Sequence, residues 1–219
     1  MTIGWVRRKL LTALGALALV LPLALVGCAP VPALPGVAAR WMAQVAGRDQ
    51  VIVVSGDSVA GTQNTVTLYD RTSTGWRQSG TWRGWNGLGG WAYAPRTGHS
   101  LSPIGVFTLT AAGGYAPYPG TRLPYEYRPA YYSLISHGVR TFNRVVAIDY
   151  NRVAYSYPSD SRRPDGPSAA FGLWLHDSHN SPTAGCVTVS DVAMLRIQQW
   201  LNPAARPAIL MGPASELRR

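Results

Sequence analysis

Hydrophobic and polar residues alternate along much of residues 50–110, which is the pattern of half-buried strands. Val51–Val54 is a short apolar run that ends at a Ser-Gly-Asp turn, and Asn64–Asp70 alternates apolar with polar side chains. Ser102–Thr110 continues the pattern, with Pro103 near its start, where a strand tolerates proline. We therefore expect this part of the chain to form strands.

The second half of the chain adds further strands and one clear helix. The strands predicted there are Tyr131–Ile135, Arg144–Tyr150, Phe171–His176 and Pro207–Met211. Ser190 is a good N-cap, apolar residues from Ala193 to Leu201 recur at helical spacing, and Asn202-Pro203 would end the helix. The chain is therefore predicted to be mainly β, with one or two short helices.

Residues 75–98 combine tryptophan with many glycines, and two interpretations compete. The aromatic rings would stack on carbohydrate at a surface, or they would fill a core between tightly turned strands. We favour the core. The segment Gly113–Pro129 has the proline and tyrosine content of a long loop, and such loops are often functional.

The N-terminal segment is predicted to be an export signal. Arg7, Arg8 and Lys9 precede the apolar run Leu10–Val26, which is short for a membrane-spanning helix. The run ends in Leu-Val-Gly-Cys at Cys28, similar to the lipobox of bacterial lipoproteins, in which the cysteine is lipidated. An ordinary cleaved signal and an uncleaved anchor are the alternatives. We expect an extracytoplasmic protein held by its lipid at the outer face of the cell membrane.

The remaining chain is long enough for one domain with a sizeable core. Residues 1–28 form the predicted signal peptide, and 29–47, rich in proline and alanine, a linker. Residues 48–213 form the predicted catalytic domain and 214–219 a tail. We expect a monomer.

Charge narrows the choice of partners. Removing the three basic residues before Cys28 lowers the formal charge of +10 to +7, and all the remaining basic residues are arginine. Export makes nucleic acid an unsuitable partner, whereas anionic wall polymers and lipid headgroups are suitable ones.

The candidate chemistry centres on the second cysteine. With Cys28 acylated, Cys186 is a lone thiol, which is expected to be reactive or to pair between chains. Gly185, directly before Cys186, leaves room for another backbone or a substrate to approach closely. His176 ends a predicted strand ten positions before Cys186. A thiolate nucleophile needs a nearby base, so we expect a Cys186–His176 dyad, with a buried structural cysteine as the alternative.

The Asp177 carboxylate is poorly placed to complete a Cys-His-Asp triad with Cys186 and His176, because adjacent strand residues point to opposite faces. Its backbone carbonyl is better placed to orient the imidazole of His176. The amide groups around Gly185 and Cys186 are the expected oxyanion donors.

Two motifs resemble a known family. Thr183-Ala184-Gly185-Cys186, preceded by His176, is similar to the Ser/Thr-x-Gly-Cys motif of the L,D-transpeptidase catalytic (YkuD) domain. Ser102–Phe107 is similar to its Thr-Pro-x-Gly-x-Phe segment. The resemblance covers roughly Val51–Gly212. The chain differs in a shorter spacer, in Ala184 where many members have histidine, and in Thr188 where they have arginine or asparagine.

The resemblance implies a β-sandwich-type fold and a cell-wall enzyme that acts on peptidoglycan stem peptides. Cys186 would be the nucleophile, His176 the general base and acid, and the Asp177 carbonyl the group that orients His176. No cofactor or metal is implied. Our candidates for substrate binding are Thr183, Tyr150, Arg152 and His137.

Two other functions compete with this one. A catalytically idle lipoprotein that binds peptidoglycan would fit the atypical motif. A zinc site built from His176, His179 and Cys186 would use ligand types that zinc prefers, although His-x-x-His on a loop is a weak signal.

Overall fold

The computed structural model describes Met1 and residues 32–219, with residues 134 and 137 excepted. The predicted signal peptide beyond Met1, its lipid acceptor Cys28 and the substrate-binding candidate His137 therefore lie outside the described residues. Within the described part, no helix is both long and apolar enough to cross a membrane.

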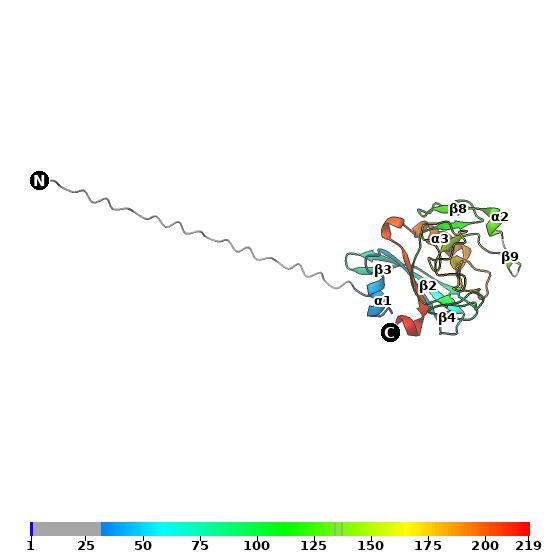
Figure 1. The fold of residues 1–219 in the computed structure, drawn as a ribbon, viewed down its shortest axis with the longest axis horizontal. Coiled ribbons are helices and arrows are strands. Elements are labelled where there is room, and N and C mark those ends of the chain that lie inside the picture. The colour runs from blue at the N-terminus through cyan, green and yellow to red at the C-terminus, as the bar shows by residue number, and fades with distance from the viewer. Residues whose placement is uncertain (2–31, 134, 137) are drawn as a thin grey trace. The chain divides into compact units, whose positions relative to one another are not determined.

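Ten strands form one curled sheet in the order β6-β14-β1-β2-β3-β13-β12-β11-β7-β8 (Figure 1). In chain order these strands are β1 Gln50–Gly56, β2 Gln63–Thr72, β3 Gly75–Trp85, β6 Gly105–Thr108, β7 Ala112–Gly114, β8 Tyr125–Tyr127, β11 Val145–Ala147, β12 Trp174–Asp177, β13 Val187–Val189 and β14 Ala208–Pro213. Two small ladders pair β4 Trp91–Ala92 with β5 Ser102–Pro103, and β9 Ile135–Ser136 with β10 Val139–Arg140. The prediction of a mainly β chain is confirmed.

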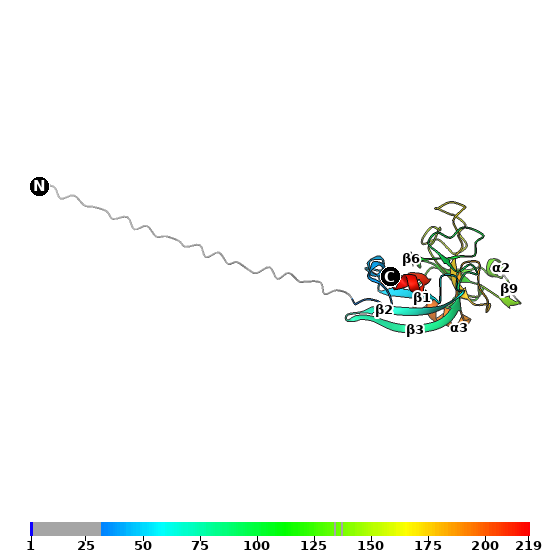
Figure 2. The same cartoon turned by 90° about the horizontal axis from the view of Figure 1, so that it is seen from below.

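The sheet is most regular around β1. This strand pairs in parallel with β14 and antiparallel with β2, and Val51, Ile52 and Val54 are fully buried. β2 and β3 are the longest strands and lie side by side as two curved ribbons (Figure 2). The main hydrophobic core gathers on these strands, and Trp76, Trp82 and Trp91 pack in it or against it. For these three tryptophans the core interpretation is correct.

The principal helix is α3, Asp191–Trp200. The Ser190 side chain accepts a hydrogen bond from the Ala193 N–H, as an N-cap should, so the predicted helix is confirmed. Its buried face holds Ala193, Met194 and Ile197. The shorter helical turns are α1 Ala39–Gln44, α2 Pro129–Tyr132, α4 Ala214–Leu217 and the 3₁₀ turn η1 Pro203–Ala205.

The folded unit begins earlier and ends later than the sequence predicted. Leu34, Val37, Trp41 and Val45 belong to the main core, so the second half of the predicted 29–47 linker is part of the domain. The predicted tail folds as α4, in which Leu217 is 2% exposed and accepts a backbone hydrogen bond from Ala38. Four apolar side chains spaced through a proline-rich segment outweigh its linker-like composition.

Several predicted strands differ from those observed, and the one predicted over Ser102–Thr110 is divided between β5 and β6. The chain from Pro129 to Tyr132 is the helical turn α2, because proline suits the first helical position, and Tyr132 packs inward with its hydroxyl 2.6 Å from a Glu126 carboxylate oxygen. The strand predicted over Arg144–Tyr150 is confined to β11.

Candidate active site

The candidate active site lies where β12 and β13 run in parallel. Leu175 pairs with Val187 and His176 with Thr188. Leu175 and Val187 are fully buried in the main core. Because neighbouring strand residues alternate in direction, His176 belongs to the other face of the sheet, together with Trp174 and Cys186. A second, smaller cluster covers that face, with Tyr132, Val145, Ala147 and Trp174 buried and Phe142 and Cys186 packed against them.

His176 is held as the sequence predicted. Its Nδ1 lies 2.8 Å from the Asp177 carbonyl oxygen, and its ring meets Phe142 edge-on at 4.7 Å. A carbonyl can only accept, so Nδ1 carries the proton and Nε2 keeps its lone pair. Burial lowers the pKa of His176 to about 4, against the opposing effect of the Asp177 carbonyl, and His179 lowers it further. The imidazole is therefore neutral at pH 7 and suited to accept a proton.

The Asp177 carboxylate points away from His176, as strand alternation requires. It accepts a hydrogen bond of 2.9 Å from the Arg144 N–H. Burial raises the pKa of Asp177 to about 6, although that N–H lowers it in part. Asp177 thus contributes its carbonyl to the site and its carboxylate to the neighbouring loop.

Cys186 is partly exposed, and its thiol bonds to backbone groups. Its Sγ accepts from the Trp174 N–H at 3.4 Å and lies 3.7 Å from the Gly172 carbonyl oxygen. Burial among apolar groups raises the pKa of the thiol to about 11, with the Trp174 N–H acting in the opposite direction. In this conformation the Cys186 thiol is protonated.

Cys186 and His176, the predicted dyad, lie near each other, but the Cys186 sulfur bonds to other groups. Across two parallel strands offset by two residues, the Cα atoms of Cys186 and His176 are about 8 Å apart. Side chains of this length span such a separation when they turn toward each other. The sulfur, however, makes its hydrogen-bond contacts here with Trp174 and Gly172, so a proton transfer to His176 requires the Cys186 side chain to turn away from them.

Gly185 and Thr183 shape the loop that presents Cys186. Gly185 has φ +132°, and a Cβ there would lie 2.8 Å from the Leu101 carbonyl oxygen, so glycine is required. Its N–H donates to Thr183 Oγ1 at 3.0 Å, and that hydroxyl donates to the Cys186 carbonyl at 2.7 Å.

These bonds bear on two predictions and give neither of them support in this conformation. The Gly185 N–H is engaged within the loop, so in this conformation it is not free to serve as an oxyanion donor. Thr183 is 8% exposed with its hydroxyl bonded on both sides, which makes it a residue that positions the loop rather than one that binds substrate.

Ser102 and Asn86 support this loop, a role that the sequence did not predict for either residue. Ser102 Oγ donates to the Gly185 carbonyl at 2.8 Å and accepts from the Gly87 N–H at 2.9 Å. The Asn86 carbonyl accepts from the Thr183 N–H at 3.0 Å. The sequence predicted a strand here and a resemblance to a family motif over Ser102–Phe107, but no contact between Ser102 and the cysteine loop.

Trp174 is another residue that sequence reasoning missed. It is 8% exposed, its ring packs edge-on with Phe142 at 5.0 Å, and its indole N–H has no hydrogen-bond partner among the described residues. Its backbone N–H bonds the Cys186 sulfur. A bulky aromatic two positions before the histidine, on the same face of a strand, was the available signal.

Tyr150 and Arg152 are engaged elsewhere. The Tyr150 ring packs edge-on against Phe107 at 5.5 Å, and its hydroxyl lies 3.4 Å from the Pro95 carbonyl oxygen. The Arg152 guanidinium is buried, pairs with the Asp149 carboxylate and donates to the Ser156 carbonyl. The charge of Arg152 is already neutralised in this conformation, so the prediction that it binds a substrate carboxylate gains no support from these contacts.

A polar cavity of about 580 Å³ lies beside the segment that follows His176. Arg83, Trp85, Ser178, Ser190 and Asp191 are among its lining residues, whereas Cys186 and His176 are not. Across the described residues, no group of three histidine, cysteine or acidic side chains is arranged to hold a metal ion. The zinc alternative built on His176, His179 and Cys186 gains no support from this geometry.

Comparisons with known proteins give no family. No protein-family model matches the chain, and a search of curated proteins returns no match. Among solved structures, the chain is similar to the "Structure of Bdellovibrio bacteriovorus Bd1075", with a TM-score of 0.43 and 15% sequence identity. The match covers 78% of this chain and 52% of that one, so this chain spans about half the length of that structure.

Proposed function

We propose that this chain is an L,D-transpeptidase-like enzyme of the bacterial cell wall, with Cys186 as its nucleophile. One observation carries the proposal. The parallel register of β12 and β13 puts Cys186 and His176 on the same face, and the Asp177 carbonyl holds the imidazole with Nε2 unprotonated. The resemblance of residues 102–107 and 183–186 to the YkuD motifs, and a mainly β fold, support it.

The reaction would follow from these roles. The Cys186 thiol turns toward His176 and gives its proton to Nε2 as the sulfur attacks the peptide carbonyl of a donor tetrapeptide stem. A carbon–sulfur bond forms, the carbon–nitrogen bond breaks, and the imidazolium returns the proton to the departing D-alanine amine. The amine of a neighbouring stem then attacks the thioester carbonyl, its proton passing through His176 to the departing sulfur as the carbon–sulfur bond breaks and the cross-linking amide forms. Water in place of the amine would make the enzyme a carboxypeptidase.

The oxyanion donors need a different assignment from the one predicted, since the Gly185 N–H is bonded to Thr183. The Cys186 N–H is adjacent to the attacking sulfur and is our remaining candidate. We also propose that the chain acts at the outer face of the cell membrane, held by a lipid on Cys28, with peptidoglycan stem peptides as its partners.

A second function, an idle lipoprotein that binds peptidoglycan, is favoured by a specific observation. The Cys186 thiol is bonded to Trp174 and Gly172 and has a raised pKa, which is the state of an unactivated cysteine. The two functions differ in whether a bound substrate moves the thiol onto His176.

Covalent capture by a carbapenem separates them. The full chain in nonionic detergent is incubated with the drug, and its intact mass is followed over time. Attack of Cys186 on the β-lactam carbonyl opens the ring, so the adduct carries the mass of the whole drug. We expect an adduct in the wild type and none in Cys186→Ala. His176→Gln should form it about 100-fold more slowly.

His99→Gln is the matched control, since His99 is an exposed histidine in another loop, and it should acylate like the wild type. An adduct that persists in Cys186→Ala removes Cys186 from the mechanism. Absence of any adduct in a folded wild type, together with binding of the protein to purified cell-wall sacculi, would favour the idle binder.

A further inference from the structure

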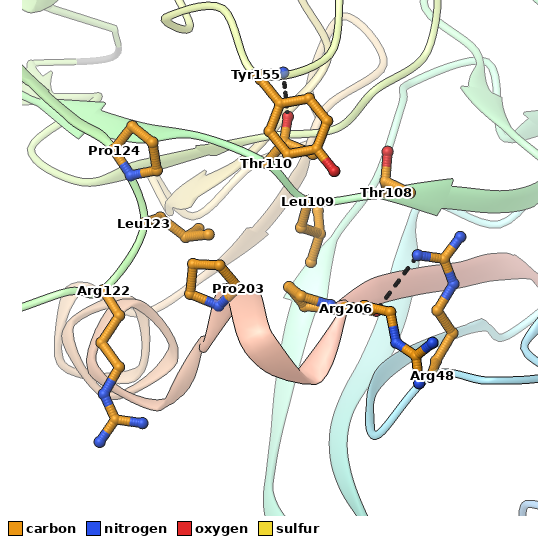
Figure 3. Close-up of a pocket in the computed structure, with 11 residues that line it drawn as sticks. Arg48, Thr108, Leu109, Thr110, Arg122, Leu123, Pro124, Tyr155, Pro203 and Arg206 are labelled. Atoms are coloured by element: carbon orange, nitrogen blue, oxygen red, sulfur yellow. Dashed lines mark hydrogen bonds between the residues drawn. The ribbon is translucent and has the colours of Figure 1, made fainter.

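A cavity of about 320 Å³ lies among segments that contribute nothing to the candidate active site (Figure 3). It is bounded by the chain between α1 and β1, the end of β6, the loop before β8, and the segment from η1 to β14. Its lining residues are Arg48, Thr108, Leu109, Thr110, Arg122, Leu123, Pro124, Tyr155, Pro203, Arg206 and Pro207. The volume is within the range of pockets that hold small organic ligands.

The lining is apolar in the middle and cationic at its ends. In Figure 3, Leu109, Leu123 and Pro203 lie between Arg122 on one side and Arg48 with Arg206 on the other. No aspartate or glutamate is among the lining residues. The cavity therefore offers an apolar surface to the body of a ligand and positive charge to an anionic group.

Most of this positive charge is not neutralised by the protein. Arg206 lies 3.7 Å from the Asp49 carboxylate, and the Arg48 guanidinium donates to the Arg206 carbonyl at 3.5 Å. Arg48 and Arg122 have no carboxylate within ion-pair distance among the described residues. The nearby carboxylate of Asp149 is already bonded to Arg152 and to the hydroxyl groups of two cavity residues, Thr108 and Thr110.

Two cavity residues hold an unfavourable backbone conformation. Tyr155 has φ +64° and Arg206 has φ +50°, and both are non-glycine residues in the left-handed region. The Tyr155 N–H is fixed by a 2.8 Å hydrogen bond to Thr110 Oγ1, while its side chain is 79% exposed. Backbone strain of this kind is concentrated at functional sites, because the fold retains it only where something is gained.

We propose that this cavity binds an organic phosphate that carries a compact apolar group. The phosphate lies against Arg48 and Arg206, since its several acceptor oxygens can accept from more than one guanidinium. The apolar group covers Leu109, Leu123 and Pro203, beneath the Tyr155 ring. Arg122 attracts the anion from the opposite end. The site does not depend on the proposed transpeptidase function, and either can fail without the other.

Phenyl phosphate is a suitable probe because it joins the two features in a soluble molecule. Titration calorimetry of the full chain in nonionic detergent should show saturable binding. Phenol and inorganic phosphate, which each lack one feature, should bind at least about tenfold more weakly. No binding of phenyl phosphate, or equal binding of inorganic phosphate, would overturn the proposal.

Charge variants locate the site. Arg48→Gln should weaken phenyl phosphate binding about tenfold, which is the cost of one charged hydrogen bond, and Arg122→Gln about threefold. Arg196→Gln removes the same charge from an exposed position on α3 and should leave the affinity unchanged. An equal loss in Arg196→Gln would mean that net charge alone attracts the probe.

Tyr155→Gly tests whether the strain serves the ligand. Glycine adopts positive φ freely, so the melting temperature should be maintained or rise while the affinity falls. A variant with unchanged affinity would show that Tyr155 has no part in binding.

The source of the phosphate is tested in nanodiscs of phosphatidylcholine, with and without phosphatidylglycerol, at physiological salt. If the lipid headgroup occupies the cavity, phosphatidylglycerol weakens phenyl phosphate binding in the wild type more than in Arg48→Gln. An equal effect on both assigns the site to a soluble organic phosphate.

Discussion

The two halves of the ten-stranded sheet, which meet where β3 pairs with β13, are built differently. In the first half, β2 and β3 are 10 and 11 residues long and form a long antiparallel ladder with one register shift, between Leu68 and Tyr69. In the other half, β11, β12 and β13 have three or four residues each. Strands this short do not stabilise one another by ladder hydrogen bonds alone. The half that carries His176 and Cys186 therefore depends on side chains that bond to the backbone.

Those side chains come from distant parts of the chain. Gln198 of α3 donates to the carbonyls of Gly113 and Val145, and so links the helix to β7 and β11. Ser102 and Thr183 hold the loop before Cys186. The comparison teaches that the half with the long β2–β3 ladder provides a rigid support, whereas the half with the candidate site is assembled from individual polar contacts.

The largest expected effect is where the two halves of the sheet meet, between β3 and β13. A Cβ on Gly84 of β3 would lie 1.8 Å from the Thr188 carbonyl oxygen of β13, so Gly84→Ala must separate these strands. We expect a loss of more than about 4 kcal/mol in the free energy of unfolding, measured by urea denaturation. Arg77→Ala, at an exposed position of the same strand, should have little effect. A Gly84→Ala protein as stable as the wild type would show that β3 and β13 are not tightly packed there.

The reactivity of the Cys186 thiol tests whether the cysteine of the candidate site is activated. Because the pKa of Cys186 is raised to about 11, its thiolate fraction rises tenfold with each pH unit below that value. His176 stays neutral throughout this range, since its pKa is lowered to about 4. The rate of iodoacetamide labelling of Cys186, followed by peptide mass spectrometry, should increase about 100-fold from pH 7 to pH 9. A plateau near pH 7 would show an activated thiolate instead.

Removal of the link from α3 should have a smaller effect. Gln198→Met keeps the volume and loses both hydrogen bonds to β7 and β11, which should cost about 2 kcal/mol in the free energy of unfolding. The neighbouring Gln199→Met is the matched control, since Gln199 is exposed and bonds only to the Pro119 carbonyl. Equal stability of the two variants would contradict the linking role of Gln198.

The smallest expected effect is within the cysteine loop. Thr183→Val removes the hydroxyl that joins the Gly185 N–H to the Cys186 carbonyl and should cost about 1 kcal/mol. Thr183→Ser should restore the stability. Chemical denaturation of both variants gives the difference, and a Thr183→Ser protein as unstable as Thr183→Val would contradict the assignment of the effect to the hydroxyl alone.

The half of the sheet that contains β1 and β2 was largely predictable from the sequence. The alternation in Asn64–Asp70 and the apolar run Val51–Val54 identified β2 and β1, and Ser190 marked the start of α3. These signals are local, because periodicity and capping depend on residues a few positions apart. The hydrogen bond from Nδ1 of His176 to the Asp177 carbonyl was predictable for the same reason.

The polar contacts in the half of the sheet that carries the candidate site were not predictable in this way. Arg152 looked like a free cation, but Asp149 and the chain around Ser156 enclose it. Thr183 looked like a substrate contact, but its partners are Gly185 and the Cys186 carbonyl. The sequence lists donors and acceptors, and only the folded chain decides which of them meet.

If Cys28 carries the predicted lipid, the burial of Leu34 limits the distance between the membrane and the start of the folded domain. Only six peptide units separate Cys28 from Leu34, and even fully extended they span about 20 Å. With the predicted lipid on Cys28, the point where the chain enters the folded domain would lie within about 20 Å of the bilayer surface.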